Sequence, residues 1–201
     1  REDKTRMAEL IAGVRLGVKQ ISPGVLSRDF HTAQVPSFNK KVKHNTRKDE
    51  LAGESHKLNT ILSKRDYRCD GLWIVAIWLN KATEFDLVRL LTALQKPKFT
   101  LYLGRKSCPL SAPVSAKLLT SESLQQALDT EFPSLLSERK DSLWLRFPKQ
   151  VTYYWQGDKE DIKGTHVETH QVWDQPTDKL RWQFTRREEH RIIKELVYHV
   201  S

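Results

Sequence analysis

The chain has 201 residues, a mass of 23.5 kDa and a formal net charge of +9 at pH 7, from 34 Lys and Arg against 25 Asp and Glu. Its 38% hydrophobic and 29% charged content is typical of a soluble globular protein and excludes the disordered and collagen classes. The longest apolar run, Leu72–Leu79, is far shorter than the roughly 18 residues of a membrane span, and no signal peptide opens the chain, so we expect a cytoplasmic protein without a membrane contact. Cys69 and Cys108 stand far apart, so neither a disulfide framework nor a cysteine-rich zinc site is expected.

The first elements are predicted to be a short helix and two extended segments. Apolar residues recur at helical spacing over residues 5–12, and Gly13 can end this helix. Apolar and polar residues then alternate over residues 14–19, which indicates a strand. A Ser-Pro-Gly turn at residues 22–24 leads into a second extended stretch, residues 25–33.

Residues 35–63 show no convincing periodicity and predict a long excursion, which in compact domains is usually functional or disordered. The stretch between Asp29 and Asp49 contains no acid and carries +5, and the stretch between Asp86 and Glu122 contains no acid and carries +6. The combined positive charge of these two stretches exceeds the net charge of the whole chain. A phosphate backbone is the simplest partner for such concentrated charge, although each run could also be only a solvated surface.

The middle of the chain predicts a strand, a helix and another strand. Residues 72–79 form a continuous apolar octet, rich in β-branched and aromatic residues, which indicates a central buried strand. A capping pattern at Thr83 and leucines at helical spacing predict a helix over residues 84–95. Residues 99–103 alternate and predict a strand that ends at Gly104, where the chain turns.

This order of elements predicts the α+β class, as a ferredoxin-like βαββαβ sheet whose first strand is absent. The C-terminal half adds a short helix near residues 124–128 and strands at 143–147, 151–155, 165–173 and 180–185, with a turn at 175–178. We therefore expect a core domain over residues 1–110 and an antiparallel, β-rich extension over residues 111–201.

Motifs for catalysis or metal binding are weak. Residues 104–107, Gly-Arg-Lys-Ser, lack the first glycine of a P-loop and have Arg where Lys is required, so nucleotide hydrolysis is not expected. Ser107 also lacks the sequence context of a nucleophile elbow. His166 and His170 lie on a predicted strand, where four residues span about 13 Å, too far for two ligands of one ion. No metal and no cofactor are therefore expected.

His31 lies near the end of the second extended stretch, just before the basic excursion. It could bind a phosphate or act as the general base of RNA cleavage together with a Lys or Tyr, and we favour the binding role. Arg65 and Tyr67 precede the apolar octet and could contact or stack on a base, although Tyr67 could equally belong to the core.

Four segments, in chain order, resemble the CasD (Cas5) family of the type I-E CRISPR Cascade complex. Residues 101–110, LYLGRKSCPL, are similar to the family signature YLGR-basic-SCPL. Residues 28–32, 65–70 and 183–187 resemble three further family segments. The similarity runs from about residue 1 to about residue 195, without the apolar strand and helix that open family proteins.

The resemblance implies an RRM-like, repeat-associated fold with a protruding basic thumb, which residues 35–63 would supply. It implies a non-catalytic subunit that grips the 5′ handle of the CRISPR RNA and caps the backbone filament beside the large subunit, meeting target DNA only through the complex. The expected RNA-contacting residues are His31, Lys40, Lys41, Lys43, His44, Arg47, Lys48, Arg65, Tyr67, Gly104, Arg105, Lys106 and Ser107.

Two alternative functions stay open. The corresponding family member of type I-C systems is itself the endoribonuclease, so the chain could be a metal-independent enzyme that cleaves CRISPR RNA. It could also be a basic protein that binds duplex DNA without sequence preference.

Overall fold

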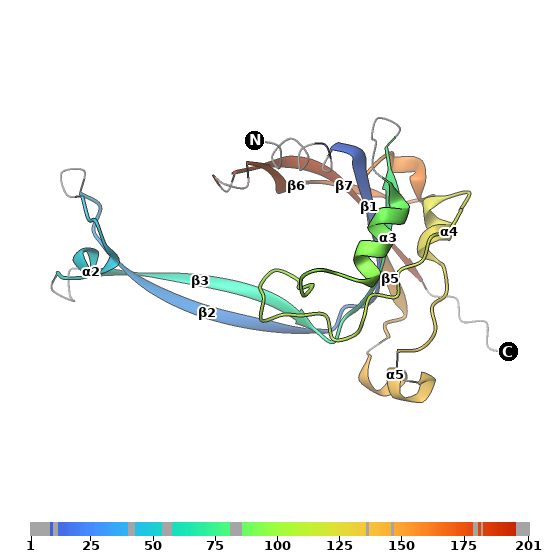
Figure 1. Ribbon diagram of the computed structural model, residues 1–201, viewed down its shortest axis with the longest axis horizontal. Coiled ribbons are helices and arrows are strands. Elements are labelled where there is room, and N and C mark those ends of the chain that lie inside the picture. The colour runs from blue at the N-terminus through green and yellow to red at the C-terminus, as the bar shows by residue number, and fades with distance from the viewer. Residues whose placement is uncertain are drawn as a thin grey trace. The chain divides into compact units, whose positions relative to one another are not determined.

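The computed structural model describes residues 9, 12–39, 43–53, 58–80, 86–135, 137–145, 147–178, 181 and 183–195. The chain divides into two units, of which one comprises residues 1–23 and 70–201 and the other residues 24–69. The first unit contains a five-stranded sheet, and the second is a two-stranded hairpin (Figure 1). No helix among the described residues is long and apolar enough to cross a membrane.

The sheet of the first unit has the strand order β4-β1-β5-β7-β6. Its strands are β1 (Val14–Ser22), β4 (Leu72–Leu79), β5 (Gln150–Trp155), β6 (Glu168–Asp178) and β7 (Gln183–Glu195). Each neighbouring pair in this sheet is antiparallel, and β1 lies between the apolar octet of β4 and the C-terminal β5. The prediction that residues 72–79 form a central buried strand is wrong in its position. Among the described residues β4 is an edge strand that pairs only with β1, so its side chains are partly exposed, and Val75 is 53% exposed. The prediction of a mixed α and β structure with an antiparallel sheet is confirmed, and the ferredoxin-like arrangement stays a prediction.

Short helices follow the strands of this unit. They are α3 (Leu87–Gln95), α4 (Leu124–Leu128), α5 (Glu138–Trp144) and the 3-10 helix η2 (Lys159–Asp161). The Asp86 side chain caps α3 by accepting a hydrogen bond from the Val88 amide at 2.8 Å. The predicted helix over residues 84–95 therefore exists, but Asp86 is its cap, and Thr83 lies outside the described residues.

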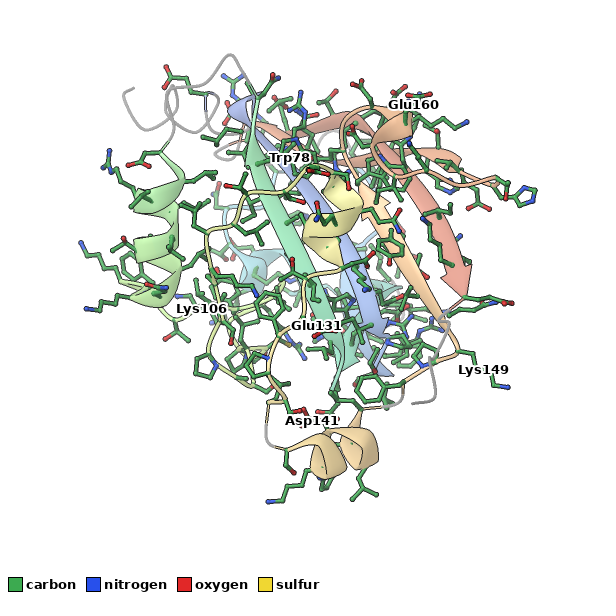
Figure 2. The ribbon with its side chains drawn as sticks, turned by 90° about the vertical axis from the view of Figure 1, so that its right-hand side faces the viewer. Trp78, Lys106, Glu131, Asp141, Lys149 and Glu160 are labelled. Carbon is green, nitrogen blue, oxygen red and sulfur yellow. The ribbon has the colours of Figure 1, made fainter. Side chains whose placement is uncertain are left out.

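The core of the first unit lies between α4 and one face of the sheet. Its buried side chains are Leu128, Val151, Tyr153, Trp155, Ile162 and Ile192. The helix can approach β1 because Gly17 has no side chain: a Cβ there would lie 3.1 Å from Leu124 Cδ1 and 3.4 Å from Trp78 Cζ3. Figure 2 shows α4 lying against the strands near Trp78.

A polar network fastens the end of α4 to the sheet. Asp129 Oδ1 accepts hydrogen bonds from Lys19 Nζ at 2.6 Å and from the Tyr153 hydroxyl at 2.7 Å. Burial alone would raise the pKa of Asp129, but these two bonds, the charge of Lys19 and a hydrogen bond from Gln125 together outweigh it, and the pKa is lowered. Lys194 Nζ donates to Gln125 Oε1 of α4 at 2.8 Å. The network therefore joins β1, β5 and β7 to α4.

The second unit consists of β2 (Val25–Pro36) and β3 (Leu58–Cys69), joined by a connection that contains α2 (Arg47–Glu50). The two strands pair without a bulge, from Val25 opposite Cys69 to Pro36 opposite Leu58. Figure 1 shows them side by side over their whole length, with α2 at the far end of the hairpin. The prediction that residues 35–63 lack regular structure is wrong for their C-terminal part, because residues 58–63 pair with β2.

Three other local predictions are wrong. Residues 99–103 form no strand, because only a single bridge joins Tyr102 to Pro109 and Phe99 is 77% exposed. The segment alternates in hydrophobicity but does not pair with a strand of the described sheets. Residues 143 and 144, expected in a strand, belong to α5, because the Ser137 side chain caps a helix there. The expected turn at residues 175–178 is part of β6, where two register shifts accommodate the chain. The helix expected over residues 5–12 lies mostly outside the described residues.

Candidate nucleic-acid interface

The hairpin brings together three residues that the sequence singled out for RNA contact. Asp29 lies opposite Arg65 in the register of β2 and β3. His31 lies opposite Ser63, the next pair on the same side. Opposed residues, and every second residue along a strand, point to one face of a ribbon. Arg65 and Tyr67 therefore share a face with His31, and we call the surface of these five residues the His31 face.

A hydrogen bond orients the imidazole on this face. His31 Nε2 lies 2.7 Å from Asp29 Oδ2, and the histidine side chain is 50% exposed. A carboxylate that holds one ring nitrogen fixes the plane of the ring and leaves the other nitrogen for a second partner. This geometry suits a histidine that binds phosphate, and it equally suits a general base.

The opposite face of the hairpin carries basic side chains that were not predicted from the sequence to contact RNA. Arg28 and Asp66 lie opposite each other there and are joined by two hydrogen bonds of 2.7 and 2.9 Å. The hydrogen bond from Arg28 lowers the pKa of Asp66, and the charges of Arg68 and Lys64 contribute in the same direction. Because the last two are exposed, they are cationic candidates that only the strand register could reveal.

Cations also lie in the connection between β2 and β3. The described residues Lys43, His44 and Lys48 are exposed. Lys40 and Lys41, which were also predicted to contact RNA, lie outside the described residues.

Arg47, the remaining predicted contact in this connection, has internal partners. Its Nη1 donates to Glu50 Oε2 at 2.6 Å, and its Nη2 donates to the carbonyl oxygen of Gln34. Arg47 therefore ties α2 to β2. Its guanidinium is less available to an external phosphate than the ammonium groups of Lys43 and Lys48.

The predicted contacts at residues 104–107 form a tight turn in the first unit. The Leu103 amide donates to the Cys108 carbonyl at 3.0 Å and closes this turn. Gly104 has φ of +81°, in the left-handed region that favours glycine. Gly104, Lys106 and Ser107 are exposed, and Arg105 is half-buried. The turn therefore presents one exposed cation, a hydroxyl and a half-buried guanidinium.

Of the two histidines expected on one strand, only His170 lies in β6, where it belongs to a group of ion pairs, whereas His166 precedes that strand. His170 Nε2 lies 3.3 Å from Glu168 Oε2, and Arg191 Nη1 donates to the same oxygen at 3.1 Å. The hydrogen bond with His170 and the charge of Arg191 lower the pKa of Glu168. Within the described ranges, no three His, Cys, Asp or Glu side chains are grouped so that they could hold a metal ion.

The family model described as "CRISPR-associated protein (Cas_Cas5)" matches residues 1–191 of this chain. The chain belongs to the CRISPR-associated Cas5 family. The resemblance drawn from its four sequence segments is thereby confirmed.

One curated relative of this Cas5 chain is "CRISPR system Cascade subunit CasD" of Escherichia coli (strain K12), to which it is 35% identical over 101 residues. That match covers 50% of the chain and 40% of the relative, so the chain spans about two fifths of the relative's length. A solved structure titled "CRISPR RNA-guided surveillance complex" matches with a TM-score of 0.53 and 19% identity, over 91% of this chain and 68% of that one. This likeness shows a shared fold.

Two of the family-like segments of this Cas5 chain lie directly against each other. Residues 28–32 are in β2 and residues 65–69 in β3, and Arg28 pairs with Asp66 as Asp29 pairs with Arg65. They are more than thirty positions apart in sequence, and the hairpin places them side by side, with residues of both segments on each of its two faces. The segments at 101–110 and 183–187 belong to the first unit.

Proposed function

We propose that this Cas5 chain is an RNA-binding structural subunit of a Cascade-type CRISPR surveillance complex in the prokaryotic cytoplasm. It grips the 5′ handle of the CRISPR RNA and caps the backbone filament next to the large subunit. It uses no metal or cofactor, has no membrane contact and meets target DNA only through the complex.

The observation that carries this proposal is the pairing of two family-like segments in the hairpin. The pairing sets Arg65, His31 and Tyr67 on one face and Lys64 and Arg68 on the other. Guanidinium, ammonium and imidazole groups bind phosphates, and an aromatic ring can stack on an unpaired base. A two-stranded hairpin is only marginally stable alone, so a bound RNA or subunit also supplies the packing that it lacks.

Exposed hydrophobic side chains support the proposed protein partners. Among the described residues, seven hydrophobic side chains are buried, whereas 22 large ones are exposed. Phe30 and Leu62 of the hairpin are 56% and 53% exposed, and Leu143 and Trp144 of α5 are 73% and 72% exposed. Large exposed apolar areas mark interaction sites, which is consistent with a chain covered by neighbouring subunits.

The test is RNA binding by the complex reconstituted with the backbone-filament subunit, the large subunit and CRISPR RNA. The triple variant Lys64→Gln, Arg65→Gln and Arg68→Gln should weaken handle binding and lower its salt slope by about 2 if all three side chains contact phosphates. The matched control replaces Lys149, Lys159 and Lys163, three exposed lysines of the first unit, with Gln. Equal slopes for the two triple variants would contradict the proposal.

A second candidate function, metal-independent cleavage of CRISPR RNA, is favoured by the contact between Asp29 and His31. An imidazole oriented by a carboxylate can act as a general base toward a 2′-hydroxyl. The experiment is incubation of the chain with repeat RNA in EDTA. Defined cleavage that is lost on His31→Ala and retained in Lys163→Ala would replace the structural function with the catalytic one.

A further inference from the structure

The β6 and β7 strands extend beyond the rest of the five-stranded sheet. β5 pairs with β7 only from His190 to Glu195, whereas β6 pairs with β7 as far as Gln183. Residues 172–178 and 183–187 therefore form a two-stranded projection of the first unit, here called the outer ribbon. Figure 1 shows β6 and β7 continuing together as a pair.

One face of the outer ribbon carries an exposed tryptophan with an arginine stacked on it. Trp173 is 62% exposed, and the guanidinium carbon of Arg186 lies 4.8 Å from its ring centroid. The register of β6 shifts between Val172 and Gln175, and a bulge of this kind re-aims the side chains within it. Phe184, two residues from Arg186 on the same side of β7, is 40% exposed. Two aromatic rings and a guanidinium thus share one face.

The nearest acidic groups on the other face are already neutralised. Asp174 accepts two hydrogen bonds from Arg187, of 2.6 and 2.8 Å, and Glu189 accepts a third from the same guanidinium at 2.7 Å. Because Arg187 neighbours Arg186 in a strand, it points to the opposite side of the ribbon. This cluster therefore stabilises the ribbon and leaves the tryptophan face to a ligand.

On the tryptophan face, Glu188 is the acid closest along β7, and it accepts a hydrogen bond from Gln171 Nε2 at 3.0 Å. Arg186 is exposed, its guanidinium lies over the indole ring, and it forms no ion pair within the described part of the chain. Arg181, exposed near the end of the ribbon, adds a second cation. Exposed aromatic rings beside a positive charge are complementary to a ligand that carries both negative groups and exposed aromatic rings of its own.

We infer that Trp173 stacks on an unpaired base of single-stranded nucleic acid and that Arg186 contacts the phosphate next to it. Arg186 covers one side of the indole, and the exposed remainder of the ring is available to a base. Stacking accepts every base, so the site takes single-stranded RNA or DNA with little sequence preference. It goes beyond the proposed function and depends on neither the hairpin nor the turn at residues 104–107.

The experiment measures binding of labelled single-stranded oligouridine and oligothymidine to the full chain by fluorescence anisotropy at several salt concentrations. Trp173→Ala should weaken binding of both by about 5- to 150-fold, the range of one lost base stack, without changing the salt slope. Trp173→Phe should restore most of the affinity. Arg186→Gln should lower the slope by about 0.7. The matched control is Trp144→Ala, because that tryptophan is 72% exposed in α5.

The inference is overturned if Trp173→Ala weakens binding less than about twofold, or no more than Trp144→Ala does. It is also overturned if Trp173→Ala keeps its affinity for both oligonucleotides but loses a protein subunit from the reconstituted complex, because the surface would then be a protein contact. The hairpin variants report separately on the proposed function, since they change the salt slope of handle binding and leave Trp173 intact.

Discussion

Asp29 Oδ2 lies 2.7 Å from His31 Nε2, and the same aspartate lies opposite Arg65 in the hairpin register. A negative charge therefore stands in the middle of a surface proposed to bind RNA. The carboxylate orients the imidazole, but it also repels phosphate. Removing its charge and removing its hydrogen bond should consequently have opposite effects on RNA binding.

Asp29→Asn should strengthen binding of CRISPR RNA by about 1.5- to 5-fold, the size of a single exposed charge interaction. The asparagine can still accept the hydrogen bond from His31, while phosphate repulsion is removed. His31→Ala should weaken binding. Titration of CRISPR RNA at low and moderate salt measures both variants, and weaker binding by Asp29→Asn would show that the His31 face does not lie against phosphates.

Substitutions of the cations in the connection between β2 and β3 should have two different effects, one on the salt dependence of RNA binding and one on the local structure. Lys43→Gln combined with Lys48→Gln should lower the salt slope of RNA binding by about 1.4, because both ammonium groups are exposed. Arg47→Gln should change the slope less and instead increase proteolysis near α2, because Arg47 holds Glu50 and the Gln34 carbonyl. Salt titration and limited proteolysis measure the two effects. A larger loss of slope from Arg47→Gln would reverse these assignments.

The turn at residues 104–107 should depend on its glycine. Gly104→Ala places a side chain on a residue with φ of +81°, which should cost about 1–3 kcal/mol of local stability. Handle binding should weaken with it if the turn contacts RNA. Gly53→Ala is the matched control, because a Cβ there would meet nothing within 4 Å. Thermal unfolding and RNA titration of both variants decide between a structural corner and a binding turn.

Asp129 should make stability depend on pH in the acid range. The pKa of Asp129 in the folded state is lowered below the ordinary value of 3.8. The ionised side chain therefore contributes fully to the free energy of unfolding above the ordinary pKa, and this contribution is lost as pH falls through the folded-state pKa. Asp129→Asn should reduce the free energy of unfolding at pH 7 by about 1–3 kcal/mol. The free energies of unfolding of variant and parent should approach each other as pH falls from the ordinary pKa toward the folded-state pKa. Denaturant unfolding between neutral and acid pH tests this, and a constant difference at all pH values would contradict it.

Several elements were predictable from the sequence because their signals are local. The apolar octet at residues 72–79 is the strand β4, although at the sheet edge and not in the centre, the alternation from Val14 is β1, and the leucines at helical spacing form α3. The spacing of apolar residues in such strands and helices depends only on which face of the element is buried. The family could also be identified from short segments, since their residue order is a property of the sequence itself.

The surfaces proposed to bind nucleic acid were decided only by the tertiary structure. Pairing of β2 with β3 placed Asp29 against Arg65, and no periodicity in residues 58–63 indicated that strand. A bulge in β6 set Trp173 beside Arg186, in a segment that the sequence assigned partly to a turn. Residues 99–103 show the converse, because they alternate as a strand does but pair only through one bridge. Strand pairing and bulges depend on partners that are distant in sequence, so they cannot be predicted from the residues next to each position.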